Sequence, residues 1–254
     1  MISPVAFYIG NVPVRWYGLM MFMGLILGYI FLKKLAKENN LNNIATMELY
    51  LFTVIGLFLG CRIFHVLVYN FQYFLSNPAS IFYIWQGGLS SHGGIIGGTL
   101  SFYVFCKKNK LPFWKLADVA IIPIGLSAGF VRIGNFLNSE VIGRVTSVPW
   151  AIEFYGRNDL RHPSQLYEAA KNFFVCGLLY NIYSVKKMNL PDGTIYWLFI
   201  FLFSFLRFFT EFFKEYIIFN SGLTIGQYIS IIFTIISGIM LFLIMSKKVN
   251  LSDV

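Results

Sequence analysis

The stretch from Arg132 to Arg144 combines charged and amide side chains at close spacing, in the order Arg-Ile-Gly-Asn-Phe-Leu-Asn-Ser-Glu-Val-Ile-Gly-Arg. It follows the apolar run AIIPIGLSAGF, residues 120–130, without an intervening turn signal. An Arg near the centre of a bilayer costs about 2.5–3.5 kcal/mol on insertion scales, so it is usually balanced by something anionic. The stretch therefore predicts the edge of a lipid-facing site at a membrane surface.

Four further side chains have the chemistry to share that site. Arg207 has Glu211 four residues later, on the same helical face, and Arg62 and His92 lie in other apolar runs. At 1.5 Å per helical residue, the three arginines Arg62, Arg132 and Arg207 lie about 20–24 Å from the inner ends of their runs. An ion pair between Arg207 and Glu211 alone is the alternative, but the common depth favours one shared cavity in the outer half of the bilayer.

The elements that carry these residues are predicted to be membrane-spanning helices. The chain has 254 residues, of which 57% are hydrophobic and 12% charged, against roughly 25% charged in soluble domains. Runs of about 20 apolar residues suit a spanning helix. We predict an all-α polytopic membrane protein, a single integral membrane domain over residues 1–254. It has an outer interfacial arm at about 70–88, a small outer head at about 138–165, and seven spans, at about 17–32, 49–69, 89–105, 116–136, 166–183, 194–213 and 225–245.

The positions of the basic residues predict the orientation of the spans. Eleven of the thirteen lysines lie in alternate connections, after the first, third, fifth and seventh runs. The positive-inside rule assigns those connections to the cytoplasm, which puts the N-terminus outside and the C-terminus in the cytoplasm. None of the seven arginines lies in a cytoplasmic connection. The net charge of +9 therefore indicates topology and an anion site rather than nucleic-acid binding.

Glycines in the third run predict close helix packing. Gly93, Gly94, Gly97 and Gly98 form two overlapping pairs of small residues four apart, a spacing that lets helix backbones approach each other. Cys61, Cys106 and Cys176 lie far apart within separate runs, and they read as small apolar side chains rather than metal ligands.

The residues alone predict binding of an anionic lipid from the outer side. The guanidinium group of Arg can donate two parallel hydrogen bonds to the phosphodiester of a phospholipid headgroup, while the acyl chains of that lipid stay in the bilayer. The chain contains no metal-ligand motif, phosphate-gripping Gly-rich loop or Gly-x-Ser-x-Gly elbow, so we expect neither a metal nor a cofactor. This reasoning reaches a ligand but not a reaction.

The sequence resembles the prolipoprotein diacylglyceryl transferase family of bacterial membranes. The matching motifs run along the whole chain: RWYG at 15–18, GGLSSHGGIIG at 87–97, GFVRIGNFLNSEVIGR at 129–144, RHPSQLYEA at 161–169, Arg207 with Glu211, and IGQYIS at 225–230. The resemblance implies transfer of a diacylglyceryl group from phosphatidylglycerol to the lipobox cysteine of a preprolipoprotein. A thioether forms and glycerol 1-phosphate leaves. It also implies a multi-pass protein of the bacterial cytoplasmic (inner) membrane that needs no cofactor. We expect a monomer, and the depth of the arginines predicts an active site toward the outer face.

The resemblance also implies roles for individual residues. The catalytic set is His92, Arg132 and Arg207, with the arginines on the phosphate and His92 as the first candidate for general base toward the thiol. An alternative is that His92 only orients the lipid and that Glu140 or Glu211 takes the proton. The predicted headgroup-binding set is Tyr17, Arg62, Asn135, Asn138, Glu140, Gly143 and Glu211.

Two positions depart from the family pattern. Phe203 stands where Tyr is usual, and Lys214 stands where Arg followed by a Pro-Asp loop is frequent. Contacts from a hydroxyl at the first position, and from the loop at the second, are therefore not expected here.

A transporter or scramblase for anionic lipid is the main alternative function, because it would use the same basic cavity. Many transporters show an internal repeat, and this chain has no repeat that joins two halves. A protease built on Ser90 or Ser91 with His92 fails, because residues adjacent in a helix cannot present the required hydrogen bond.

Overall fold

The computed structural model describes residues 3–39, 41, 46–69, 71–83, 88, 90–186, 190–215, 222–249 and 251, and within these the side chains of Tyr69, Ser91, His92 and Lys186 lie outside the description. The chain divides into two compact units. The first comprises Met1–Lys34 and Trp114–Val254, and the second comprises Leu35–Phe113. The two units are described separately below.

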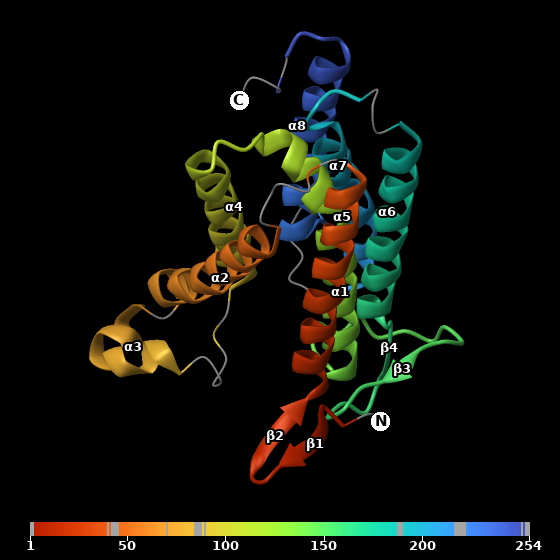
Figure 1. Cartoon of the computed structure of the whole chain (residues 1–254). Helices are drawn as coiled ribbons and strands as arrows, with labels where there is room; N and C mark the ends of the chain where they lie inside the picture. The colour runs from red at the N-terminus through yellow and green to blue at the C-terminus, as the bar shows by residue number, and fades with distance from the viewer. Residues whose placement is uncertain are drawn as a thin grey trace. The chain divides into compact units, whose positions relative to one another are not determined.

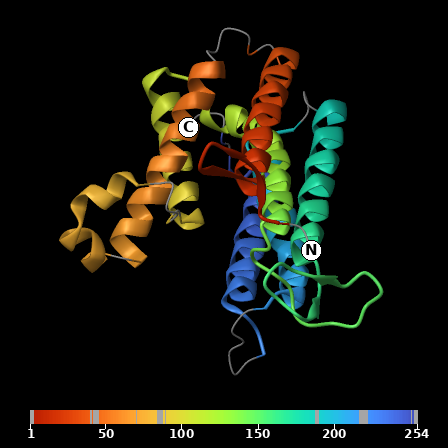
Figure 2. The same ribbon diagram turned by 90° about the horizontal axis from the view of Figure 1, so that it is seen from below.

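The first unit is built from long helices and two short antiparallel pairs of strands (Figure 1). Its helices are α1 (Trp16–Glu38), α5 (Phe113–Leu137), α6 (Ser164–Lys186), α7 (Thr194–Thr210) and α8 (Ile225–Met245), and the short helix η4 (Glu211–Phe213) continues α7. The unit boundaries fall just inside two of these helices. The residues of α1 after Lys34 belong to the second unit, as does Phe113, the first residue of α5. Figures 1 and 2 show α1, α5 and α6 running side by side.

Five helical segments in the described residues are long and apolar enough to cross a membrane. They are Trp16–Glu38, Thr46–Val68, Phe113–Leu137, Thr194–Phe213 and Ile225–Met245. These segments match five of the seven expected spans, and the mostly helical fold agrees with the predicted class. The expected spans at 89–105 and 166–183 are helical, as α4 (Ser91–Lys108) and α6, but glycines in the first and polar residues in the second lower their hydropathy. That these two cross the membrane, and the orientation of all seven, stay predictions.

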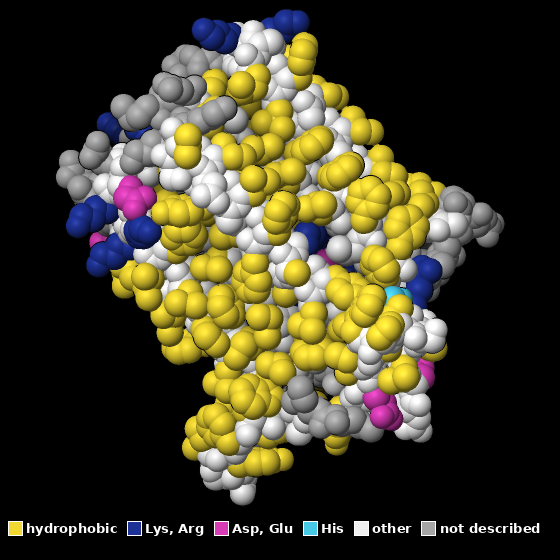
Figure 3. Space-filling model, turned by 90° about the vertical axis from the view of Figure 1, so that its right-hand side faces the viewer, with side chains coloured by type: hydrophobic (Ala, Val, Ile, Leu, Met, Phe, Trp, Pro, Cys, Tyr) yellow, Lys and Arg dark blue, Asp and Glu magenta, His cyan; other side chains and the backbone are white. Residues whose placement is uncertain are grey.

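The surface of the helices is apolar to a degree that suits hydrocarbon. On α8, the side chains of Ile232 and Phe242 are 55% and 64% exposed. Apolar side chains cover most of the face shown in Figure 3. Contiguous apolar surface of this kind marks contact with a membrane or a partner rather than with water.

Close approaches at glycines hold α1, α6 and α7 against α5. A Cβ at Gly24 in α1 would lie 3.1 Å from Phe130 Cβ, and the Ser127 hydroxyl donates to the Gly24 carbonyl oxygen at 2.7 Å. On another side of α5, a Cβ at Gly125 would lie 3.0 Å from the Phe199 ring of α7. The ring of Phe173 in α6 fills the space beside Gly129 in the same way. Helix α5 is therefore the central helix of this unit.

Asp118 connects the first turns of α5 and α7. Its Oδ2 accepts from the backbone N–H of Gly193 at 2.8 Å, and its Oδ1 accepts from that of Tyr196 at 2.7 Å. These N–H groups belong to the start of α7, where a helix has no internal acceptors. A buried carboxylate of one helix thus caps the N-terminus of another.

The two pairs of strands are additional to the all-α prediction. Strands β1 (Val5–Ile9) and β2 (Val12–Arg15) pair antiparallel, with Ile9 opposite Val12, and Gly10 takes φ of +59° in the turn. Strands β3 (Ile152–Glu153) and β4 (Leu160–Arg161) form the second pair, inside the predicted outer head. Both pairs are too short to form a core, and each extends a helix end.

The second unit contains α2 (Thr46–Phe64), the π-helix η1 (His65–Tyr69), α3 (Phe71–Ser76), the 3-10 helix η2 (Pro78–Phe82) and α4. Helices α2 and α4 meet backbone to backbone: a Cβ at Gly60 would lie 2.8 Å from the Cα of Gly97. Gly93 also has no room for a side chain, because a Cβ there would meet the Gly60 carbonyl group. The predicted close packing is confirmed at Gly93 and Gly97, whose partners are Gly56 and Gly60, whereas a Cβ at Gly98 would make only an ordinary contact with Leu57, at 3.5 Å.

Candidate functional site

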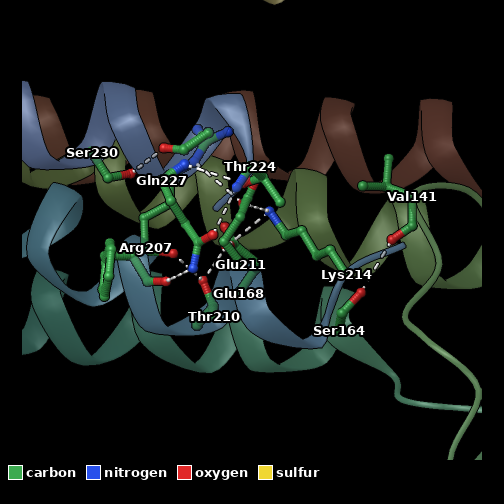
Figure 4. Close-up of polar contacts among 12 residues, drawn as sticks. Val141, Ser164, Glu168, Arg207, Thr210, Glu211, Lys214, Thr224, Gln227 and Ser230 are labelled. Carbon is green, nitrogen blue, oxygen red and sulfur yellow. Dashed lines mark hydrogen bonds and ion pairs between the residues drawn. The ribbon is translucent and has the colours of Figure 1, made fainter. Parts of the chain in front are cut away.

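Four cationic side chains and two carboxylates meet where α5, α6 and α7 end or begin in the first unit. They are Arg132 of α5, Glu168 and Lys171 of α6, and Arg207, Glu211 and Lys214 at the end of α7 (Figure 4 shows most of them). Apart from the two arginines, each of these side chains is at most 4% exposed. A buried charge is stable only where it is paired and hydrogen-bonded, so the six side chains depend on each other.

Glu168 is the carboxylate with most partners in this group. Its Oε2 lies 3.1 Å from Lys171 Nζ and 3.7 Å from Arg132 Nε. Its Oε1 lies 3.1 Å from Lys214 Nζ and accepts a hydrogen bond from the Thr210 hydroxyl at 2.5 Å. One carboxylate of α6 therefore fixes side chains from α5 and from the end of α7.

Glu211 joins the same group to the start of α8. Its Oε2 accepts from Lys214 Nζ at 3.1 Å and lies 3.9 Å from Arg207 Nε. Its Oε1 accepts from the Thr224 hydroxyl at 3.4 Å, next to the first turn of α8. A Cβ at Gly226 would overlap this carboxylate, so glycine is required there. The positive end of the helix dipole adds to the stabilisation of the anion.

The start of α8 is held by a reciprocal pair of hydrogen bonds. The Thr224 hydroxyl accepts from the Gln227 N–H at 3.2 Å, and the Gln227 side chain accepts from the Thr224 N–H at 2.9 Å. This capping box satisfies backbone groups that a helix start leaves unpaired. The motif IGQYIS thus places the first turn of α8 against Glu211.

Arg132 and Arg207 are the accessible cations of the group. Their side chains are 23% and 34% exposed, whereas their carboxylate partners are almost fully buried. In the described part of the chain each guanidinium approaches its carboxylate through Nε, at 3.7 and 3.9 Å. Arg132 Nη1 also donates weakly to Asn135 Oδ1, at 3.5 Å. Their exposure makes both guanidiniums candidates for binding an anion.

The amides after Arg132 converge on Glu140. The Asn135 amide donates to Glu140 Oε2 at 3.2 Å, and the Asn138 amide donates to Glu140 Oε1. The Asn138 Oδ1 is buried and has no partner within the described residues. The predicted residues Arg132, Asn135, Asn138 and Glu140 thus form one connected network.

The loop that carries Glu140 is strained. Ser139 and Val141 have φ of +54° and +53°, which is unfavourable for a residue other than Gly and a genuine outlier for a β-branched one. The start of α6 holds this conformation: the Gln165 amide donates to the Glu140 carbonyl oxygen at 2.6 Å, and the Ser164 hydroxyl donates to that of Val141 at 3.2 Å. Strain of this kind costs about 1–3 kcal/mol and clusters at functional sites.

Gly143 lies where the head meets the end of α7. It forms an isolated bridge with Lys214, and a Cβ there would lie 2.7 Å from the carbonyl oxygen of Phe213 and would also overlap that of His162. The Arg144 guanidinium donates to the Lys214 carbonyl oxygen at 2.9 Å. Gly143 is therefore a spacer that brings the backbone of Lys214 close to the head, and it lies beside the ionic group rather than within it.

Arg161 holds the head together. Its guanidinium pairs with Asp159 at 2.7 Å and with Glu215 at 2.8 Å, and it donates to the Gly143 carbonyl oxygen at 3.0 Å. The hydrogen bonds from Arg161 hold the pKa of Asp159 below its usual value. This arrangement gives Arg161 a structural role, as salt bridges in outer loops often have.

Tyr17 and the residues of the second unit complete the predicted set. A Cβ at Gly134 would lie 3.2 Å from the Tyr17 Cα, so Tyr17 packs beside the helix turn that carries Arg132. In the second unit, Arg62 donates to the carbonyl oxygens of Ser80, Ile81 and Gly88 at 2.6, 2.8 and 3.1 Å. It therefore holds the arm that follows α2.

His92 belongs to α4, but its side chain lies outside the described part of the structure. The catalytic role of His92 and the headgroup-binding role of Arg62 stay predictions.

Reasoning from the sequence missed three members of the ionic group. Glu168 lies within the motif RHPSQLYEA but has no predicted role, and Lys171 and Lys214 are not in the predicted set of site residues. A signal was present, because Glu168 and Lys171 are ionisable residues three apart inside an apolar run, and such residues are functional candidates by default.

A comparison with protein families matches residues 4–244 to the family described as prolipoprotein diacylglyceryl transferase. The chain belongs to this family. The match confirms the resemblance drawn from the motifs, and it identifies the chain as a transferase.

Individual members of the prolipoprotein diacylglyceryl transferase family are similar over most of their length. A protein of Geobacter sulfurreducens named phosphatidylglycerol–prolipoprotein diacylglyceryl transferase is 40% identical over 206 residues, which are 78% of this chain and 77% of that protein. Proteins with the same name from Rhizobium meliloti and Brucella canis are 40% and 42% identical, over 75% of this chain and 72% of each relative.

Proposed function

We propose that this chain transfers the diacylglyceryl group of phosphatidylglycerol to the lipobox cysteine of a preprolipoprotein. The observation that carries the proposal is the pair of accessible guanidiniums, Arg132 and Arg207, held above two buried carboxylates. A phosphodiester suits two such forks, and the apolar helix surfaces suit its acyl chains. The names of the related transferases supply the two substrates.

The bonds that change are the same in any enzyme of this reaction. The cysteine sulfur attacks the glyceryl carbon, a C–S bond forms, and the bond between that carbon and the phosphate oxygen breaks. The electron pair of the broken bond stays on the phosphate, so a phosphodiester monoanion becomes the phosphomonoester dianion of glycerol 1-phosphate. The thiol proton passes to a base, because the thiolate is the nucleophile.

Arg132 and Arg207 stabilise the second negative charge as it develops. Donors that are already aimed at the position of developing charge need no reorganisation during the reaction, which is where electrostatic catalysis gains most. Glu168 and Glu211 orient these two guanidiniums, because each buried carboxylate contacts one of them.

Burial and existing contacts distinguish the residues that could accept the proton of the cysteine thiol. Glu211 is nearly fully buried and already paired with Lys214 and Thr224, so a thiol would have to displace a cation to reach it. Glu140 is exposed at the end of the amide network, and together with His92 it remains a candidate for the proton transfer. Asn138 Oδ1, which has no partner among the residues that the structure describes, would accept a hydrogen bond from a headgroup hydroxyl.

The expected setting is the bacterial cytoplasmic membrane, with seven spans, the N-terminus outside and the site near the outer face. The apolar surfaces of α7 and α8 and the lysine distribution support this topology. A monomer is expected, because the first unit alone assembles the ionic group.

The test is a transfer assay with purified protein, phosphatidylglycerol and a lipobox peptide that contains one cysteine. The mass of the peptide should increase by one diacylglyceryl group, and Arg132→Ala should abolish the increase. Arg157→Ala is the matched control, because Arg157 is an exposed residue of the head, and it should retain activity. Lipid movement across vesicles without a thioether product would show a transporter instead, and full activity of Arg132→Ala would remove the phosphate role.

Replacing His92 separates the two candidates for the base. If His92 takes the thiol proton, His92→Gln should lose turnover and Glu140→Gln should affect mainly lipid binding. Near-normal turnover of His92→Gln would leave the proton transfer to Glu140.

A further inference from the structure

Lys171 is a buried cation for which the proposed reaction has so far given no use. Its side chain is 4% exposed, its Nζ lies 3.1 Å from Glu168 Oε2, and it lies 3.9 Å from the centroid of the Phe203 ring. Removing an ammonium group from water is expensive and is rarely repaid by a single ion pair. Its burial therefore requires an explanation.

Neutralising Glu168 does not explain it. That carboxylate already has Lys214 at 3.1 Å, Arg132 at 3.7 Å and the Thr210 hydroxyl. The second contact of Lys171 in the described structure is an aromatic face, which stabilises a cation without cancelling its charge. Lys171 thus adds charge to the group rather than balancing it.

The net charge of the ionic group follows from its members. Arg132, Lys171, Arg207 and Lys214 are four cations, and Glu168 and Glu211 are two carboxylates, so two positive charges remain. Without Lys171, one would remain. Within the described residues, Glu140 connects to Arg132 through the Asn135 amide, and Glu140 is exposed, where water and salt screen its charge.

We propose that Lys171 provides this site with its second net positive charge, and that the site thereby prefers the phosphomonoester dianion that leaves over the phosphodiester monoanion that enters. This inference rests on the proposed function. Only interactions that are stronger with the transition state than with the substrate accelerate a reaction. The attraction of a charge that appears on the phosphate as the bond breaks is such an interaction. Lys171 contributes to it from beside Arg132, since both cations lie against Glu168 Oε2.

The same preference makes the protein sensitive to its own product. A site that favours a dianionic phosphomonoester should retain glycerol 1-phosphate, so the soluble monoester should inhibit competitively with respect to phosphatidylglycerol. Glycerophosphoglycerol, the deacylated headgroup, has a phosphodiester with one charge and should bind more weakly. A phosphomonoester acquires its second charge with a pKa of about 6, so inhibition by glycerol 1-phosphate should strengthen as the pH rises through that value.

Lys171→Met gives a quantitative test, because the lost interaction scales with the charge of the ligand. The loss in affinity for a dianion should be the square of the loss for a monoanion. With an effective dielectric constant of about 40 and a separation on the order of 10 Å, the inhibition constant should rise about fourfold for glycerophosphoglycerol and about sixteenfold for glycerol 1-phosphate. Lys171→Arg keeps the charge and should keep the wild-type ratio.

Lys34→Met is the matched control. Lys34 donates to the Tyr180 hydroxyl at 3.2 Å, away from the ionic group, and its replacement should change neither constant. Equal losses for the two inhibitors in Lys171→Met would overturn the inference, since a merely structural defect gives that result. If Lys171→Met does not fold, the wild-type protein still decides, because equal inhibition by the two compounds at pH 7, where the monoester is already mostly a dianion, refutes the preference. Absence of peptide transfer by the wild-type protein would instead refute the proposed function.

Discussion

Neutralising Glu168 should destabilise the protein more than any other single change in the ionic group. Glu168→Gln keeps the shape of the side chain and removes the charge that Lys171, Lys214 and Arg132 share. Removing one partner of a buried ion pair costs about 3–5 kcal/mol, because it leaves an uncompensated charge. For a chain of this length 1 kcal/mol corresponds to roughly 2–4 °C, so we expect the melting temperature to fall by about 6–20 °C.

The assay is thermal unfolding in detergent, with Glu153→Gln as the control. Glu153 is an exposed residue of β3, so the same chemical change should shift the melting temperature by about 1 °C or less, as exposed ion pairs contribute little.

A second variant tests the reason for the loss. Adding Lys171→Met to Glu168→Gln removes a cation that the first change left unpaired, so the double variant should recover stability relative to Glu168→Gln, with a coupling free energy of about 1–3 kcal/mol. Glu168→Gln with a melting temperature within 2 °C of wild type would refute the pairing. A double variant in which the two losses simply add would refute the charge argument.

Three other predictions concern the backbone contacts and the head. Gly97→Ala should lower stability by about 1–3 kcal/mol through overpacking, whereas Gly98→Ala should be tolerated because the nearest atom to its Cβ would be Leu57 Cβ at 3.5 Å; thermal unfolding of both variants checks this. Gly143→Ala should reduce transfer strongly by displacing the backbone near Lys214, as the peptide mass assay would show, and wild-type activity would contradict the spacer role. Since the Arg161 contact depresses the pKa of Asp159, its stabilisation is present above the unfolded pKa, at about 4, and is lost as the pH falls through the folded value. The unfolding free energy of Asp159→Asn should therefore differ from that of wild type at pH 7, and the two should converge as the pH falls below the lowered pKa of Asp159.

The parts of the site that the sequence predicted are those made by near neighbours along the chain. Arg132, Asn135, Asn138 and Glu140 lie within nine residues, and a helix end brings such residues together whatever the rest of the fold does. Arg207 and Glu211 are one helical turn apart, and their contact follows from the helix period.

The members of the site that could not be predicted from the sequence depend on contacts between segments far apart in the chain. Lys214 contacts Glu168 across 46 positions of sequence, and no local spacing indicates that. The bonds of Arg62 were equally invisible in the sequence, because its guanidinium donates to carbonyl groups 18 to 26 residues later. Its role in headgroup binding stays a prediction.

One missed element had a local signal. Gly10-Asn11 separates two short β-prone runs, and a Gly-Asn pair in that position is typical of a hairpin. A reading based on hydropathy passes over such a segment, because a hairpin of five and four residues is too short to register as a span.

The cap that Asp118 places on α7 has a consequence for the distant end of both helices. Asp118 and Arg132 are 14 residues apart on α5, about 21 Å, and Tyr196 and Arg207 are 11 residues apart on α7, about 17 Å. The cap prevents α7 from sliding along α5. It therefore fixes where Arg207 lies relative to Arg132 along the helix axes, although both residues are at the opposite end of their helices. The relative position of the two guanidiniums therefore depends on a single carboxylate at the opposite end of the helices. Loss of that carboxylate should misalign the two side chains that we propose bind the phosphate, although neither of them is itself changed.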